Sequence, residues 1–136
     1  MRKIFFALLS LNLLTACMTT HEGILGTQSS QVQTRNYQSR AFDTNDREMV
    51  LRSILSTMQD LGFIIDRADE TLGTISGTSF TQNSKLTVSV RQMGKSQILV
   101  RASAQAGLNE IDDPVAYQNF FNSLAQSLFL DAHTVE

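Results

Sequence analysis

Apolar and polar residues alternate over two neighbouring segments, and this pattern constrains the fold more than any other feature of the chain. The apolar positions of the first segment are Leu86, Val88 and Val90. Those of the second segment are Ile98, Val100, Ala102 and Ala104. Because successive side chains of a strand point to opposite faces, each segment predicts a strand with one buried and one exposed face. Their closeness in sequence predicts an antiparallel hairpin.

The register of this hairpin follows from the requirement that apolar side chains face one another. A two-residue turn at 94–95 would set Val88 opposite Arg101 and mix the two faces. A three-residue loop over 93–95 keeps the apolar side chains together, in the pairs Val90–Ile98, Val88–Val100 and Leu86–Ala102. We therefore predict the three-residue loop.

Two segments with helical spacing flank the strands. The first, 46–61, follows Asn45 as a capping residue, with Glu48 completing a capping box, and Gly62 ends it. Its apolar stripe is Val50, Ile54, Met58 and Leu61. The second begins at Asp113-Pro114, a capping side chain followed by proline at the first helical position. Its apolar stripe is Tyr117, Phe120, Phe121, Leu124 and Leu128.

Three further strands are predicted over 36–42, 63–67 and 72–80, and the element order becomes β-α-β-β-β-β-α. Glycines at 73 and 77 suggest a bulge or close packing against a helix within the third of these strands. Hairpin-connected strands and two amphipathic helices predict an α+β domain over 35–136, a two-layer fold with a largely antiparallel sheet of four to five strands. The composition, 42% hydrophobic and 18% charged, supports one such domain and excludes a disordered chain.

The N-terminus has the pattern of an export signal. Met1, Arg2 and Lys3 give a positive start, and the apolar stretch 4–14 that follows is much shorter than the roughly 20 residues that span a bilayer. We predict that residues 1–16 are a cleaved signal peptide. Their loss removes two basic and no acidic side chains, so the net charge changes from −2 to −4. An acidic chain without a basic cluster argues against nucleic-acid binding.

The residues Leu14-Thr15-Ala16-Cys17 resemble the lipobox of bacterial lipoproteins. The resemblance implies cleavage between Ala16 and Cys17, a diacylglycerol thioether on Cys17, and acylation of the new amino group with a fatty acid such as palmitate. Met18 in place of Asp implies sorting to the outer membrane, with retention in the inner membrane as the alternative. An ordinary secretory signal with a chance cysteine is the competing interpretation. Cys17 is the only cysteine, which excludes an internal disulfide and a multi-cysteine metal site.

The segment 18–34 is rich in Thr, Ser, Gln and Gly and predicts a flexible tether with a root-mean-square span of about 22 Å. His21 lies in this tether without a second ligand nearby, so we expect a solvated side chain. The element order of the domain is similar to the helix-grip-like domains of an accessory lipoprotein of the outer-membrane β-barrel assembly machine. The pattern 60–63, Asp-Leu-Gly-Phe, followed by 72–75, Leu-Gly-Thr-Ile, resembles a recurrent feature of small proteobacterial lipoproteins.

No pattern of catalytic residues is recognisable, and we expect neither an enzyme nor a bound metal or cofactor. Two acidic clusters are assigned structural roles, in a hairpin turn and at a helix N-terminus. They are Asp66, Asp69 and Glu70, and Glu110, Asp112 and Asp113. A calcium site in the second cluster and a hydrolase using Asp112 and Asp113 are the alternatives. His133, near the chain end, is expected to face helix carbonyls.

The expected function is a non-enzymatic, membrane-anchored lipoprotein that faces the periplasm and serves a cell-envelope assembly or export complex as an accessory or scaffold. Its candidate partner surface is the polar face of the sheet, with two residues of the last helix. These residues are Thr87, Ser89, Arg91, Leu99, Arg101, Phe129 and Leu130. The alternative is an apolar-ligand site between helix and sheet. The competing interpretation of the same residues is a filled core. Its lining would be Phe120, Phe121, Leu124, Leu128, Val88, Val90, Ile98 and Val100.

Overall fold

A computed structural model describes residues 32–129 and 132–134. They belong to the second of two units into which the chain divides, Met1–Ser30 and Gln31–Glu136. The predicted signal peptide, Cys17, His21, the tether up to residue 31 and Leu130 lie outside the described residues. In the described part of the chain, no helix combines the length and apolarity that a bilayer crossing requires.

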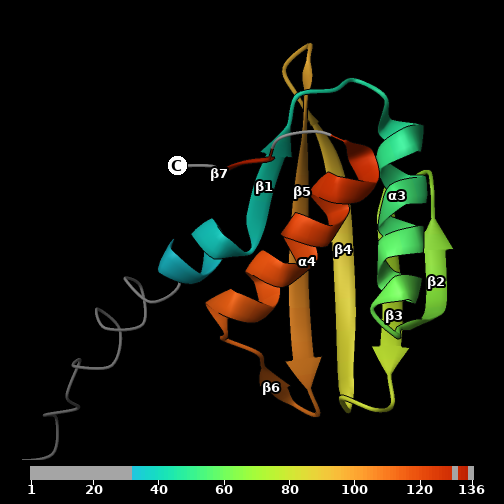
Figure 1. The fold of residues 1–136 in the computed structure, drawn as a ribbon, viewed down its shortest axis with the longest axis vertical. Helices are drawn as coiled ribbons and strands as arrows, with labels where there is room; N and C mark the ends of the chain where they lie inside the picture. The colour runs from blue at the N-terminus through green and yellow to red at the C-terminus, as the bar shows by residue number, and fades with distance from the viewer. Residues whose placement is uncertain (1–31, 130–131, 135–136) are drawn as a thin grey trace, which may run out of the picture. The chain divides into compact units, whose positions relative to one another are not determined.

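A seven-stranded antiparallel sheet forms one layer of the domain (Figure 1). Its strands are β1 Ser39–Phe42, β2 Ile64–Asp69, β3 Thr74–Ser79, β4 Ser84–Met93, β5 Gln97–Ala106, β6 Asn109–Glu110 and β7 Ala132–Thr134. The spatial order is β2-β3-β4-β5-β1-β7, and β6 pairs with the end of β5. The sheet is therefore built around β5, which pairs with β4, β1 and β6.

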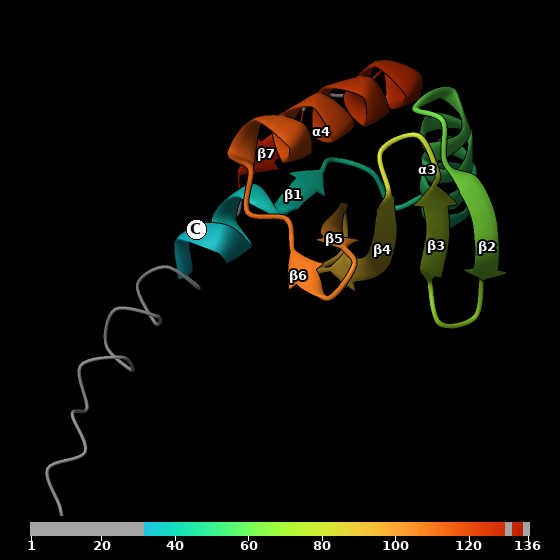
Figure 2. The same ribbon diagram turned by 90° about the horizontal axis from the view of Figure 1, so that it is seen from below.

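Two helices, α3 (Arg47–Asp60) and α4 (Pro114–Leu128), cover one face of this sheet (Figures 1 and 2). Their buried stripes join the inward residues of β1, β3, β4 and β5 in a single core cluster. The predicted two-layer α+β architecture is confirmed. The two strands that were not predicted, β6 and β7, have only two and three residues and carry no alternating pattern.

The ends of the helices agree closely with the capping residues in the sequence. The Asp113 carboxylate accepts a hydrogen bond from the Val115 N–H at 3.0 Å, which confirms the predicted start of α4. At α3 the cap is Asp46 instead of Asn45, with its carboxylate 2.8 Å from the Met49 nitrogen. A carboxylate at this place also complements the positive end of the helix dipole.

Gly62 ends α3 as predicted, in a left-handed conformation with φ of 84°. The N–H groups of Gly62 and Phe63 donate to the carbonyls of Gln59 and Met58 at 3.0 and 2.9 Å, which is the Schellman arrangement. The next glycines lie in β3 and the turn before it. A Cβ on Gly77 would come within 2.9 Å of the Met58 methyl group, so close packing against the helix is confirmed.

The hairpin of β4 and β5 differs from its predicted register by two residues. Val90 lies opposite Val100, Val88 opposite Ala102 and Leu86 opposite Ala104, and the three-residue loop is 94–96 instead of 93–95. A shift of two residues leaves every side chain on its predicted face, so burial alone cannot separate the two registers. The glycine at 94, with φ of 66°, marks the start of the observed loop.

The beginning of the domain also differs from the prediction. Residues 32–37 form a short helical segment, where the sequence predicted the end of the tether and the start of a strand. The first strand is accordingly β1, four residues long. The turn between β2 and β3 is 70–73 instead of 68–70. His133 lies in β7, whose backbone pairs with β1 at Ala41, and its side chain is outside the description.

The space between α4 and the central strands is a filled core. The eight residues predicted as the lining of a ligand site are at most 5% exposed and all belong to the core cluster. Val88, Ile98, Val100 and Leu124 are fully buried. A filled core, the competing interpretation of these residues, is therefore confirmed, and the alternative of a ligand site at them is wrong, because their side chains fill the space between the helix and the sheet.

Gly73 provides a stability test of the turn that joins β2 to β3. Its φ is 68°, and a Cβ there would lie 2.5 Å from Arg47 Nη2 and 2.7 Å from the Val90 carbonyl oxygen. Gly62 has a similar φ but no neighbour within 4 Å of such a Cβ. We expect Gly62→Ala to lower the free energy of unfolding by about 1 kcal/mol. Gly73→Ala should lower it by at least about 1 kcal/mol more, because of the clash.

Urea unfolding of the two variants measures this difference. Equal losses for Gly73→Ala and Gly62→Ala would contradict the close approach at Gly73.

Candidate functional site

The face of the sheet opposite the helices carries five of the predicted partner-surface residues. Cross-strand pairs of β4 and β5 place them in adjacent rows of this outer face, Thr87 opposite Ser103, Ser89 opposite Arg101 and Arg91 opposite Leu99. The structure therefore brings these five residues together. Phe129 is 94% exposed but ends α4, in the other layer, so it does not belong to the same surface.

Two arginines dominate the chemistry of this outer face. Arg91 and Arg101 are both exposed and lie on neighbouring strands at diagonal positions, roughly 7–8 Å apart between Cβ atoms. Half-buried Leu99 lies opposite Arg91 and next but one to Arg101 along β5. Among the described residues, the ion pairs are Glu48–Arg52 and Arg67–Asp69, and neither involves these two arginines. Guanidinium groups in such a position can bind carboxylates.

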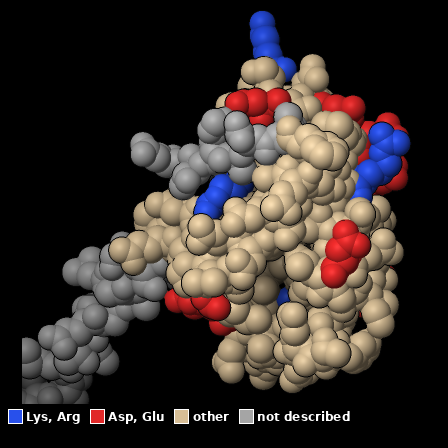
Figure 3. Space-filling view, viewed as in Figure 1, with Lys and Arg blue, Asp and Glu red and all other residues tan. Residues whose placement is uncertain are grey.

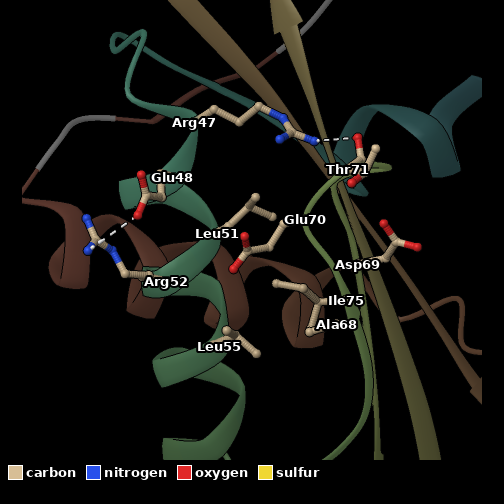
Figure 4. Close-up of a pocket in the computed structure, with 10 residues that line it drawn as sticks. All are labelled: Arg47, Glu48, Leu51, Arg52, Leu55, Ala68, Asp69, Glu70, Thr71 and Ile75. Carbon is tan, nitrogen blue, oxygen red and sulfur yellow. Dashed lines mark hydrogen bonds and ion pairs between the residues drawn. The ribbon is translucent and has the colours of Figure 1, made fainter.

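A second feature is a cavity of about 370 Å³ between α3 and the hairpin of β2 and β3 (Figure 4). Its floor is apolar, formed by Leu51, Leu55, Ala68 and Ile75. Its rim is charged, formed by Arg47, Glu48, Arg52, Asp69 and Glu70. Figure 4 shows Glu70 pointing from the hairpin turn toward α3. Its lining also includes Thr71, and contains no histidine, serine or cysteine.

The rim contacts hold the hairpin turn in place. Arg47 Nη2 donates to the Thr71 carbonyl at 3.2 Å, and Asp69 Oδ1 accepts from the Leu72 N–H at 2.9 Å. The Leu72 hydrogen bond lowers the pKa of the Asp69 carboxyl below its usual value, and Arg67 lowers it further. The Asp66 carboxylate accepts from the Thr78 hydroxyl at 2.7 Å. These contacts agree with the structural role predicted for the first acidic cluster.

The second acidic cluster is also held by hydrogen bonds, two of them to residues more than seventy positions earlier in the chain. Glu110 accepts from the Gln38 amide at 2.7 Å, Asp112 accepts from the Thr34 hydroxyl at 3.1 Å, and Asp113 caps α4. Over residues 32–129 and 132–134, no three His, Cys, Asp or Glu side chains group in a way that could hold a metal ion. The cluster therefore ties the first described segment to the loop before α4.

Tyr117 forms a buried polar centre that was not predicted from the sequence. Its spacing indicated only a place in the apolar stripe of the last helix. Its hydroxyl donates to the Ile111 carbonyl at 2.9 Å and accepts from the Ala104 N–H at 2.9 Å and the Gln38 amide at 3.3 Å. The Gln38 side chain is itself buried, and its backbone carbonyl accepts from the Ala102 N–H at 2.8 Å. A polar residue within a short predicted strand, Gln38, was the only signal in the sequence.

An apolar groove of about 280 Å³ lies beside this centre, between the start of α4 and the end of the sheet where β4 begins. Its lining is mainly apolar and includes Leu61, Phe63, Leu86, Ile111 and Phe120. Gln82 and Asn119 add polar groups. The groove borders the filled core, and Leu86, Tyr117 and Phe120 contribute to both.

Comparisons with known proteins assign no family to this chain. No protein-family model matches it, and no curated protein matches it. The functional argument therefore rests on the sequence and the geometry.

The Tyr117 centre can be tested by removing one oxygen atom. We expect Tyr117→Phe to lower the free energy of unfolding by about 1–3 kcal/mol, because the Ala104 N–H, the Ile111 carbonyl and the Gln38 amide lose a partner. Tyr37→Phe is the matched control, since Tyr37 is half-buried, whereas Tyr117 is buried, and the Tyr37 hydroxyl donates to Thr34. Tyr37→Phe should lower the free energy of unfolding by less than about 1 kcal/mol. Urea unfolding curves in which both variants lose the same stability would argue against a polar centre at Tyr117.

Proposed function

We propose that this protein is a lipid-anchored, non-enzymatic accessory or scaffold protein of the cell envelope, on the periplasmic face of the outer membrane. Support for the anchor comes from the sequence, in which the only cysteine follows a positive start and an apolar stretch at the lipobox position. Acylation at two or three positions would hold the protein on a membrane almost permanently.

The scaffold role rests chiefly on one observation, the outer face of the sheet, which neither α3 nor α4 covers. Antiparallel sheets can leave one face free, and this face carries two exposed arginines around a half-buried leucine. Its chemistry fits an acidic protein segment, which would place carboxylates on the guanidinium groups and an apolar side chain on Leu99.

Cys17→Ser tests the anchor. In the wild-type protein, we expect the intact mass to show loss of residues 1–16 and gain of lipid, and the protein to fractionate with outer membranes. The Cys17→Ser protein should carry no lipid and should leave the membrane fraction. Met18→Asp is the matched control, expected to keep the lipid and move to the inner membrane. A Cys17→Ser protein that is still processed and membrane-bound would refute the anchor.

Arg91→Glu combined with Arg101→Glu tests the partner surface. After gentle solubilisation and affinity purification, we expect the amount of partner protein recovered to fall at least about tenfold, because the reversed charges repel acidic groups. Arg52→Glu is the control, since Arg52 is also exposed but lies on α3 in the other layer. A wild-type protein that reproducibly purifies alone, or equal losses for both variants, would count against this surface.

A further inference from the structure

Exposed apolar side chains gather at one end of the domain. Seven large hydrophobic side chains are exposed among the described residues. Five of them lie toward the end of the sheet at which β4 begins and β5 finishes, here called the proximal end, and they are Val32, Ile64, Phe80, Leu108 and Val115. Only Leu72 and Phe129 lie at the opposite end, in the turn between β2 and β3 and at the end of α4.

Two of these side chains occupy the tips of turns, where polar residues are the rule. Phe80 begins the turn between β3 and β4 and is 77% exposed, and Leu108 lies in the turn between β5 and β6 and is fully exposed. Their strands are two positions apart in the sheet, roughly 10 Å. The apolar groove also lies at this end. Its lining includes Phe63, Ile111 and Gln82, and Gln82 belongs to the same turn as Phe80. In the space-filling view, uncharged atoms make up most of this end (Figure 3).

The described chain begins beside the same end. Thr34 is bonded to Asp112 and Gln38 to Glu110, and the rings of Tyr37 and Tyr117 lie 5.5 Å apart. The segment that leads back to Cys17 therefore starts at the proximal end. As the coil that its composition predicts, this 14-residue segment would span about 21 Å. β4 alone, with ten residues, is about 33 Å long, so the span of such a coil is shorter than the distance from the proximal to the opposite end of the sheet.

We infer that the proximal end docks on the lipid surface, with Phe80 and Leu108 inserted among the headgroups. This inference rests on the proposed lipid anchor. Two apolar side chains alone bind a bilayer weakly, but the anchor makes their insertion an intramolecular step with a high effective concentration. Docking by this end leaves the outer face of the sheet, with Arg91 and Arg101, free for a protein partner.

The charges at the proximal end favour a zwitterionic surface over an anionic one. Glu110, Asp112 and Asp113 precede α4 there, and Asp60 ends α3 at the same end. The cations nearby are Lys85 at the start of β4 and Arg35 in the first helical segment. Acidic groups thus outnumber basic ones, and anionic lipids would be repelled.

The experiment uses the absence of tryptophan from the chain. Phe80→Trp and Leu108→Trp each introduce a single fluorophore into the full-length lipidated protein, reconstituted into vesicles of phosphatidylethanolamine and phosphatidylcholine with brominated acyl chains. Leu72→Trp is the matched control, because Leu72 is 69% exposed at the opposite end. We expect quenching by the brominated lipid to be at least about twofold stronger at positions 80 and 108 than at 72. Replacing half of the lipid by phosphatidylglycerol should weaken the quenching at positions 80 and 108.

Vesicle flotation in the same samples separates the two proposals. If the proteins float but Trp at 80 and 108 is quenched no more than Trp at 72, the docking inference is overturned while the anchor stands, and the apolar end would then suit a protein partner. If the proteins do not float, the anchor is refuted and the docking inference falls with it. Circular dichroism of each variant confirms that the fold is unchanged.

Discussion

The hydroxyl group of Tyr117 is the interaction on which the arrangement of this domain depends. It satisfies polar groups from three separate parts of the chain, the segment before β1, the end of β5 and the loop before α4. The Ala104 N–H and the Ile111 carbonyl would lose this partner at partly buried positions if α4 moved. One side chain thereby fixes both the position of α4 on the sheet and the point at which the chain joins the domain.

The two faces and the two ends of the sheet differ in chemical character. The inner face supplies the apolar core, which is filled at the residues between α4 and the central strands. The outer face is polar, with two exposed arginines that have no ion pair in the described part of the chain. One end collects most of the exposed apolar side chains. Stability and recognition are thus separated, so the outer face can change without disturbing the core.

Patterns of burial and local capping were predictable from the sequence, because they depend on near neighbours in the chain. The faces of β4 and β5, the start of α4 at Asp113 and its first residue Pro114, and the end of α3 at Gly62 are examples. The register of the hairpin was not predictable, since two loops of equal length keep the same faces. No local pattern in the sequence predicts the short strands β6 and β7 or the Tyr117 centre. They depend on groups that only the fold brings together.

The pairing partners of β1 determine when this strand can join the sheet during folding. Its neighbours are β5 and β7, so the first strand of the chain pairs only with segments that follow it by more than fifty residues. Such distant pairing carries a large loop-closure cost and slows folding. The hairpins of β2, β3 and β4 can form while β1 still lacks a partner. We therefore expect β1 to join the sheet after these hairpins, and β7, which pairs with β1 alone, to join with it or after it.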